Sequence, residues 1–273
     1  MEQFIEVPGG RLFATSDGEG LPIVLVHAAI ADHRAWDAMV PGLVAAGFRV
    51  ARYDYRAYGQ STTEDVEYSN RADLIAVLDA LGIDRAALVG NSRGGLIAFD
   101  TAVEFPDRVV AAIGVGASLS GYDGSPTPQE LVIFERAARV MAAATPDLDA
   151  IADLSVSLWV DGPGQSPDRV DPAIREAVRA MCRPLGASDR VTGRPIPLEP
   201  RAAQRLADLR CPVLAVAGEL DVSDVVQTAH YLEENAPNGR AVVWPDVAHM
   251  IGMEAPARLN ALIVDFLAPF RPW

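Results

Sequence analysis

The sequence contains no lysine, so all 23 of its basic residues are arginine. This absence excludes chemistry that proceeds through a lysine Schiff base. Basic residues are also outnumbered by 37 acidic ones, which gives a net charge of −14 and a pI near 4.6. A chain with this charge is a poor partner for nucleic acid and for anionic membrane surfaces, and we expect it to bind neither.

Cysteine is scarce, and long hydrophobic runs are missing. Cys182 and Cys211 are far apart in the sequence, which favours reduced thiols over a disulfide. No group of His and Cys has the spacing of metal ligands, so we expect neither a metal nor another cofactor. No segment approaches the roughly 20 apolar residues of a membrane span, and the first residues lack the pattern of a signal peptide. These features predict a cytoplasmic protein.

What is present is an alternation of strand-like and helix-like segments from Pro22 to Val115. The alternation predicts an α/β fold with a mostly parallel, doubly wound sheet. Between Val115 and the next strand-like run at Val213 lie roughly 95 residues, far more than the dozen of an ordinary crossover connection. We therefore interpret residues 119–205 as a helical cap, inserted into a core formed by residues 1–118 and 206–273.

One short segment carries the strongest functional signal. An apolar run ends in Gly90-x-Ser92-x-Gly94, and an apolar stretch with helical spacing follows it. This is the pattern of a nucleophile elbow, in which a strand turns sharply into a helix and nearby glycines let neighbouring backbone approach the serine. The hydroxyl is then exposed at the helix N-terminus, where free N–H groups can stabilise an oxyanion.

A serine nucleophile needs a base and an acid that orients the base. Among the four histidines, His249 lies on a loop between a strand-like run and a C-terminal amphipathic helix. Asp221 closely follows another buried strand, at the edge where open α/β sheets place their sites. We prefer Asp221 as the acid because of this short interval, and Asp224 suits the start of the next helix. The competing acids are Glu219, Asp224 and Asp246.

The order Ser92, Asp221, His249 is that of the α/β-hydrolase family, which the chain resembles over nearly its whole length. Two further segments carry the resemblance, one from Val24 to Ala29 and the other, Asp-Tyr-Arg-Ala-Tyr-Gly-Gln-Ser, at residues 54–61. The family usually has glycine where this chain has Ala28 and Ala57. The resemblance implies an oxyanion hole formed by the backbone N–H groups of Ala29 and Arg93.

Several side chains near this predicted site remain to be assigned. We interpret His27 as structural, because an imidazole at a strand end more often bonds nearby backbone. The Arg93 guanidinium could pair with a buried carboxylate or face a substrate carboxylate, and we favour the structural pairing. The residues expected to line the substrate pocket are Ala28, Trp159 and Met250.

The resemblance implies a serine hydrolase that cleaves a small-molecule carboxylic ester or lactone through an acyl-enzyme on Ser92. The same residues could serve a C–C bond hydrolase, a thioesterase, an acyltransferase or a perhydrolase, because a fold does not choose among chemistries. A ligand-binding receptor that retains the triad is the alternative from another class. The sequence leaves the choice between monomer and homodimer open.

Overall fold

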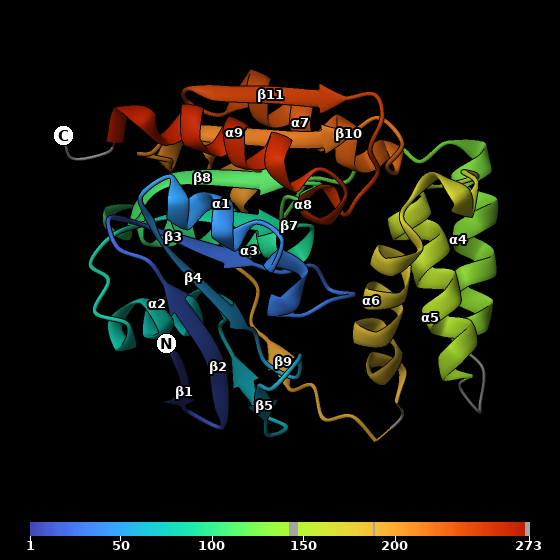
Figure 1. Cartoon of the computed structure of the whole chain (residues 1–273), viewed down its shortest axis with the longest axis horizontal. Coiled ribbons are helices and arrows are strands. Elements are labelled where there is room, and N and C mark those ends of the chain that lie inside the picture. The colour runs from blue at the N-terminus through green and yellow to red at the C-terminus, as the bar shows by residue number, and fades with distance from the viewer. Residues whose placement is uncertain (142–146, 188, 271–273) are drawn as a thin grey trace.

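The computed structural model describes residues 1–141, 147–187 and 189–270. At its centre lies a sheet with the strand order β1-β2-β4-β3-β7-β8-β10-β11 (Figure 1). The pairs β1–β2 and β2–β4 are antiparallel, and every pair from β4 to β11 is parallel. The strands of this path are β1 (Glu2–Val7), β2 (Gly10–Asp17), β3 (Leu21–Val26), β4 (Phe48–Asp54), β7 (Ala86–Asn91), β8 (Val109–Val115), β10 (Val213–Gly218) and β11 (Gly239–Trp244).

Helices cover both faces of this sheet. Along β3, Val24 and Val26 point into the apolar cluster under α2 (Asn70–Ala80), α3 (Arg93–Glu104) and α7 (Ser223–Asn235). Ile23 and Leu25 point into the opposite cluster, under α1 (Val40–Ala45), α8 (Ile251–Glu254) and α9 (Pro256–Leu267). Alternate residues of one strand thus face different helix layers, as the pleat requires. The mostly parallel, doubly wound α/β sheet predicted from the sequence is confirmed.

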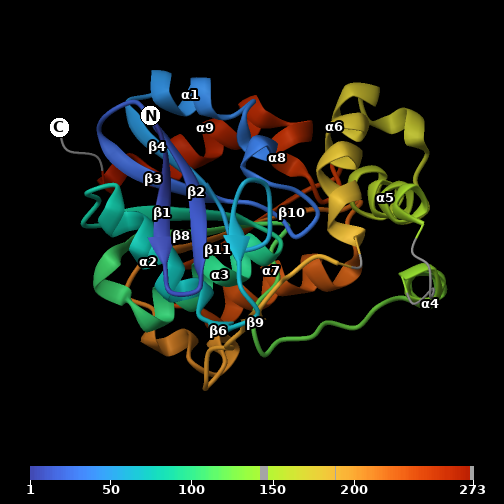
Figure 2. The same cartoon turned by 90° about the horizontal axis from the view of Figure 1, so that it is seen from below.

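Three longer helices lie between β8 and β10: α4 (Pro128–Met141), α5 (Leu148–Val156) and α6 (Pro172–Cys182). Together with the segments that join them, they are called the insertion below. Figures 1 and 2 show these helices as a separate layer beside the carboxyl ends of the strands. Helix α5 continues into a π-helical turn, η3 (Ser157–Asp161). Apolar spacing in the sequence indicates helices over residues 129–144, 148–160 and 172–181, and these ranges match the elements of the insertion, except that residues 142–144 lie outside the described part.

The remaining elements are short. Strand β5 (Thr62–Thr63) pairs with β2, and β6 (Glu67–Tyr68) pairs with β9 (Arg194–Pro195). The 3-10 helices are η1 (His33–Trp36), η2 (Pro106–Arg108), η4 (Pro167–Arg169), η5 (Arg183–Gly186), η6 (Ala202–Gln204), η7 (Leu206–Asp208) and η8 (Ala268–Phe270). Among the described residues, no helix combines the length and apolarity needed to cross a bilayer.

The two alanines at family glycine positions behave differently. Ala57 has φ 65°, in the left-handed region that glycine adopts without strain. The Arg190 guanidinium donates two hydrogen bonds, of 3.0 and 2.6 Å, to the carbonyl oxygen of Ala57. Ala28 is not among the described non-glycine residues with positive φ, which are Ala57, Ser92 and Asn238. The loop after β3 therefore accommodates Ala28 without left-handed strain.

Candidate active site

Ser92 lies between β7 and α3 with φ 56° and ψ −119°, a conformation that side-chain-bearing residues rarely adopt. The flanking glycines make this turn possible. A Cβ at Gly94 would lie 2.1 Å from the Val26 carbonyl oxygen, and one at Gly90 would lie 2.1 Å from the Gly94 oxygen. Such contacts are shorter than any atom pair tolerates, so both positions require glycine. The strained serine between close-packed glycines is the geometry expected of a nucleophile elbow.

His249 and Asp221 form a buried pair. The His249 Nδ1 donates to the Asp221 Oδ2 at 2.7 Å, and both side chains are at most 3% exposed. The Asp221 Oδ1 accepts the Val222 backbone N–H at 2.7 Å. A Cβ at Gly218, the last residue of β10, would lie 2.2 Å from the Val247 oxygen, so the two loops pack closely. With Nδ1 donating, the Nε2 atom of a neutral His249 carries a lone pair.

The other candidate acids lie elsewhere. Asp246 pairs with Arg258 at 2.8 Å, and Asp224 accepts the Gly124 backbone N–H. Glu219 borders a small cavity that Asp221 also lines, but its carboxylate forms no hydrogen bond with His249 in the described part of the chain. Of the four acids considered, Asp221 is the one whose carboxylate contacts His249.

Asn91 connects the serine to the histidine loop, and sequence reasoning missed it. Its Nδ2 donates to the carbonyl oxygens of Val115, at 2.7 Å, and of His249, at 3.1 Å. Gly116 packs between the side chains of Asn91 and Asp221, because an added Cβ would lie 3.3 Å from each of them. The backbone of His249 is thus tied to the residue before Ser92. The hydrogen bonds among the described residues do not include one from the Ser92 hydroxyl to the imidazole, which in ligand-free active sites often forms only with substrate.

The loop after β3 borders the serine. The backbone N–H groups of Ala29 and Arg93, the predicted oxyanion donors, have no hydrogen-bond acceptor among the described residues. His27 is buried, and its Nδ1 lies 2.8 Å from the Ala28 oxygen, while its ring stacks on Tyr55 at 4.1 Å. Burial lowers the pKa of His27, although the nearby Asp54 opposes this effect. A neutral, stacked imidazole suits the structural role expected for His27.

Arg93 differs from the favoured interpretation. Its guanidinium forms no ion pair with any described carboxylate, and its one hydrogen bond goes to the Tyr58 hydroxyl at 3.5 Å. The prediction of a structural pairing is therefore wrong. The reason is that α3 presents the residue after Ser92 to an open cavity of about 490 Å³, which Arg93 lines together with Tyr55 and Ser118.

The residues predicted to line the pocket have different surroundings. Trp159 packs on the His249 ring with 4.6 Å between centroids, and it borders an apolar cavity of about 370 Å³ between α4 and α5. Ala28 and Met250 are each 1% exposed and belong to the apolar cluster that joins the insertion to the core. Trp159 is thus the predicted pocket residue that lines a cavity.

A second connection missed by sequence reasoning joins the insertion to the His249 loop. Arg169 forms an ion pair with Glu254 at 2.5 Å, and Glu254 accepts the Ala248 backbone N–H at 3.1 Å. Burial raises the pKa of Glu254, while Arg169 opposes that shift. Nothing in the sequence marks these residues as partners, because 85 positions separate them.

One group of side chains could in principle hold a metal ion. Ligand atoms of Asp32, His33 and Asp54 lie within 4.8 Å of one another. Each already has a partner: the Arg34 side chain donates two hydrogen bonds to Asp32, and the His33 Nδ1 lies 2.9 Å from Asp54. These contacts account for the cluster as part of the scaffold around η1.

Comparisons with known proteins identify the family of the chain. The model of the alpha/beta hydrolase family matches residues 23–262, and the chain belongs to this family. Epoxide hydrolase B from Mycobacterium tuberculosis is 25% identical over 100% of this chain and 99% of its own. A thermophilic esterase from Thermogutta terrifontis, solved with malate bound, is 26% identical with a TM-score of 0.78 over 100% of both chains. Est816, described as an N-acyl homoserine lactone degrading enzyme, is 26% identical with a TM-score of 0.74 over 97% of this chain and 100% of its own. The protein is a hydrolase.

Proposed function

We propose that the protein is a serine hydrolase of carboxylic esters or lactones. The observation that carries the proposal is the buried hydrogen bond from His249 to Asp221, together with its tie through Asn91 to the strained Ser92. The resemblance to an esterase and to a lactone-degrading enzyme supports the same class of substrate.

The reaction has two acyl transfers. The Ser92 Oγ attacks the substrate carbonyl carbon while its proton passes to the His249 Nε2, and the backbone N–H groups of Ala29 and Arg93 stabilise the oxyanion. The C–O bond to the alcohol then breaks, and His249 returns the proton to the leaving oxygen. Water next loses its proton to His249 and attacks the acyl-serine, which releases the acid and restores Ser92. Asp221 orients the imidazole and stabilises its charged form.

The identity of the nucleophile favours acyl transfer over epoxide opening. Attack of a serine oxygen on an epoxide carbon would leave an ether on Ser92, which has no carbonyl for water to attack. Attack on an ester or lactone leaves an acyl-serine, which the same machinery hydrolyses. Trp159, which packs on His249, also borders the apolar cavity between α4 and α5, and that cavity suits an uncharged chain of such a substrate.

The test is a series of p-nitrophenyl esters of increasing chain length, with intact-mass detection of a fluorophosphonate adduct. We expect Ser92→Ala to lose the adduct and to lower kcat by about 10⁴-fold or more, as removal of a catalytic serine does. Ser166→Ala is the matched control, because the Ser166 hydroxyl only caps η4 in the insertion. Full activity in Ser92→Ala would contradict the proposal.

Partial outcomes are informative as well. An adduct without ester turnover would mean that Ser92 is a working nucleophile, and lactones, thioesters, C–C substrates and acyl acceptors would be tested next. Neither adduct nor turnover would overturn the proposal and make ligand binding the leading alternative. A receptor would then show ligand-dependent hydrogen-exchange protection in the insertion.

A further inference from the structure

The cavity of about 490 Å³ on the α3 side of Ser92 contains three arginines in its lining: Arg71, Arg93 and Arg201. It adjoins the elbow, because Arg93 directly follows Ser92 and the backbone N–H of Ser118, also in the lining, donates to the backbone carbonyl oxygen of Ser92 at 3.3 Å. The cavity thus begins beside the backbone of the elbow, and the inference below requires that a substrate on Ser92 extends into it.

Two of these arginines are neutralised. Arg71 forms an ion pair with Glu104 and also donates to the Ile196 oxygen at 3.1 Å. Arg201 pairs with Glu199 at 2.9 Å. Arg93 has no carboxylate partner in the described part of the chain.

The acidic residues of the lining do not neutralise Arg93. Asp100 accepts the Ser120 hydroxyl at 2.5 Å, and Asp224 accepts the backbone N–H of Gly124. Asp123 also lines the cavity, but forms no ion pair with any described arginine. The guanidinium next to the nucleophile is thus left with the Tyr58 hydroxyl at 3.5 Å.

Arg93 lies at a position where an anion would be stabilised. It is the first residue of α3, and the N-terminus of a helix carries the positive end of the dipole, where a cation is destabilising. The guanidinium also lacks a counter-ion among the described residues. An anion in the cavity would interact favourably with both the guanidinium and the dipole.

We propose that Arg93 binds a carboxylate of the substrate, so that the hydrolase selects esters or lactones that carry a free carboxylate near the scissile bond. Arg93 then has two roles: its backbone N–H faces the oxyanion, and its guanidinium forms a charge-assisted, bidentate contact with the substrate. In a protein with a net charge of −14, an unpaired local cation of this kind is needed to attract an anionic substrate. The inference rests on the proposed function, since it places the scissile carbonyl at Ser92.

The test compares isosteric substrates that differ in charge. In the first pair, monomethyl glutarate carries a carboxylate on the acyl side, and methyl 5-oxohexanoate is its neutral counterpart. In the second pair, 4-acetoxybenzoate carries the carboxylate on the leaving group, and 4-acetylphenyl acetate is its neutral counterpart. For each pair, the ratio of kcat/KM for the acidic ester to kcat/KM for the neutral ester is measured in wild type, Arg93→Gln, Arg93→Lys and Arg210→Gln. Arg210 pairs on the surface with Asp107, so Arg210→Gln makes the same change in net charge away from the cavity.

We expect Arg93→Gln to lower the ratio by about 10- to 100-fold for at least one pair, the size of a hydrogen bond to a charged group. Arg93→Lys should keep part of the preference, and Arg210→Gln should leave the ratio as in wild type. The affected pair shows whether the carboxylate belongs to the acid or to the alcohol.

An equal loss on acidic and neutral esters in Arg93→Gln would overturn the inference and assign the side chain a structural role. The inference would also be overturned if wild type showed a ratio of acidic to neutral kcat/KM near or below one for both pairs. Failure of the proposed function is distinguishable, because wild type would then hydrolyse none of the four esters and Ser92 would form no fluorophosphonate adduct.

Discussion

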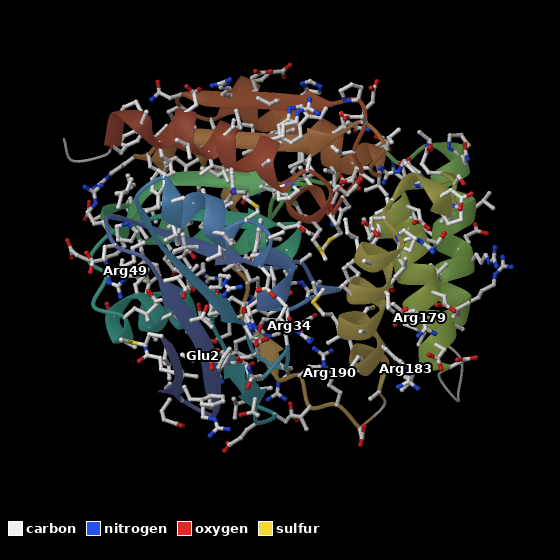
Figure 3. All side chains as sticks on the ribbon, in the orientation of Figure 1. Glu2, Arg34, Arg49, Arg179, Arg183 and Arg190 are labelled. Atoms are coloured by element: carbon white, nitrogen blue, oxygen red, sulfur yellow. The ribbon has the colours of Figure 1, made fainter. Side chains whose placement is uncertain are left out.

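The central sheet and the insertion differ in what holds their chains in place. Ser92 directly follows β7 and Asp221 closely follows β10, and every residue of these two strands is buried. In the insertion, a smaller apolar cluster packs against the core, and arginine contacts join its own segments: Arg175 binds Asp161 with two hydrogen bonds, and Arg179 bonds both Asp149 and Asp153. Figure 3 shows Arg179 and Arg183 close together on the insertion.

Because of this difference, we expect the sheet to hold the proposed catalytic groups more rigidly than the insertion holds its exposed side chains. Burial fixes the strand ends in a close-packed interior that tolerates little displacement, so the geometry of the proposed catalytic groups follows from the core. Exposed ion pairs contribute less stability and are screened by salt. The exposed surface of the insertion can therefore change its sequence at low energetic cost, while the apolar cluster holds its inner face against the core.

Breaking a buried ion pair in the core tests the rigid half of this comparison and should have the largest effect on stability. Arg56 donates to Asp73 at 2.7 and 2.9 Å, and both side chains are at most 6% exposed. Arg56→Gln leaves the Asp73 charge buried without its partner, so we expect the free energy of unfolding to fall by about 3–5 kcal/mol in urea titrations. The control is Arg194→Gln, which breaks an exposed pair with Asp65; equal losses in the two variants would refute the comparison.

The sequence predicted the parts of the site that depend on strand ends. Glycines around Ser92, and an acid and a histidine after later strands, are local signals, and a parallel sheet brings them to one edge whatever the details of packing. Contacts across the insertion were not predictable. The Arg169–Glu254 pair and the placement of Trp159 on His249 depend on how α5, η3 and η4 pack, and no periodicity encodes a contact between residues this far apart.

The surroundings of the Arg93 side chain were not predictable from the sequence either. The sequence assigned its backbone through the elbow pattern, but the environment of its guanidinium depends on segments around residues 118–124 and 195–201, which form the cavity. The preference for pairing rested on the expectation that an exposed cation beside the nucleophile is unusual in a site for apolar esters. The side chain instead lines an open cavity.

The joint between the two regions can be tested at Glu254, where we expect an intermediate effect. Glu254→Gln keeps an acceptor for the Ala248 N–H but removes the charge that Arg169 binds. The free energy of unfolding should fall by about 1–3 kcal/mol, and kcat should fall by roughly 10-fold through displacement of the His249 loop, with a smaller change in KM. Urea titration and steady-state kinetics on the best ester substrate measure both.

The control for this joint is Asp246→Asn, on the same loop, because Asp246 pairs with Arg258 at the surface. Hydrogen exchange should show faster exchange in residues 157–170 for Glu254→Gln and not for Asp246→Asn. If both variants kept wild-type kcat and exchange, the insertion would not be coupled to His249 through Arg169.

The smallest effect is expected at Arg179, which sharpens the comparison by its dependence on salt. Arg179→Gln removes ion pairs with Asp149 and Asp153, whose side chains are 52% and 63% exposed. Because salt already screens such pairs, Tm should fall slightly in low salt, and the difference from wild type should vanish near 1 M NaCl. The loss in Arg56→Gln should persist in high salt, since its partner is shielded from ions. A salt-independent loss at Arg179 would mean that the insertion is held as rigidly as the core.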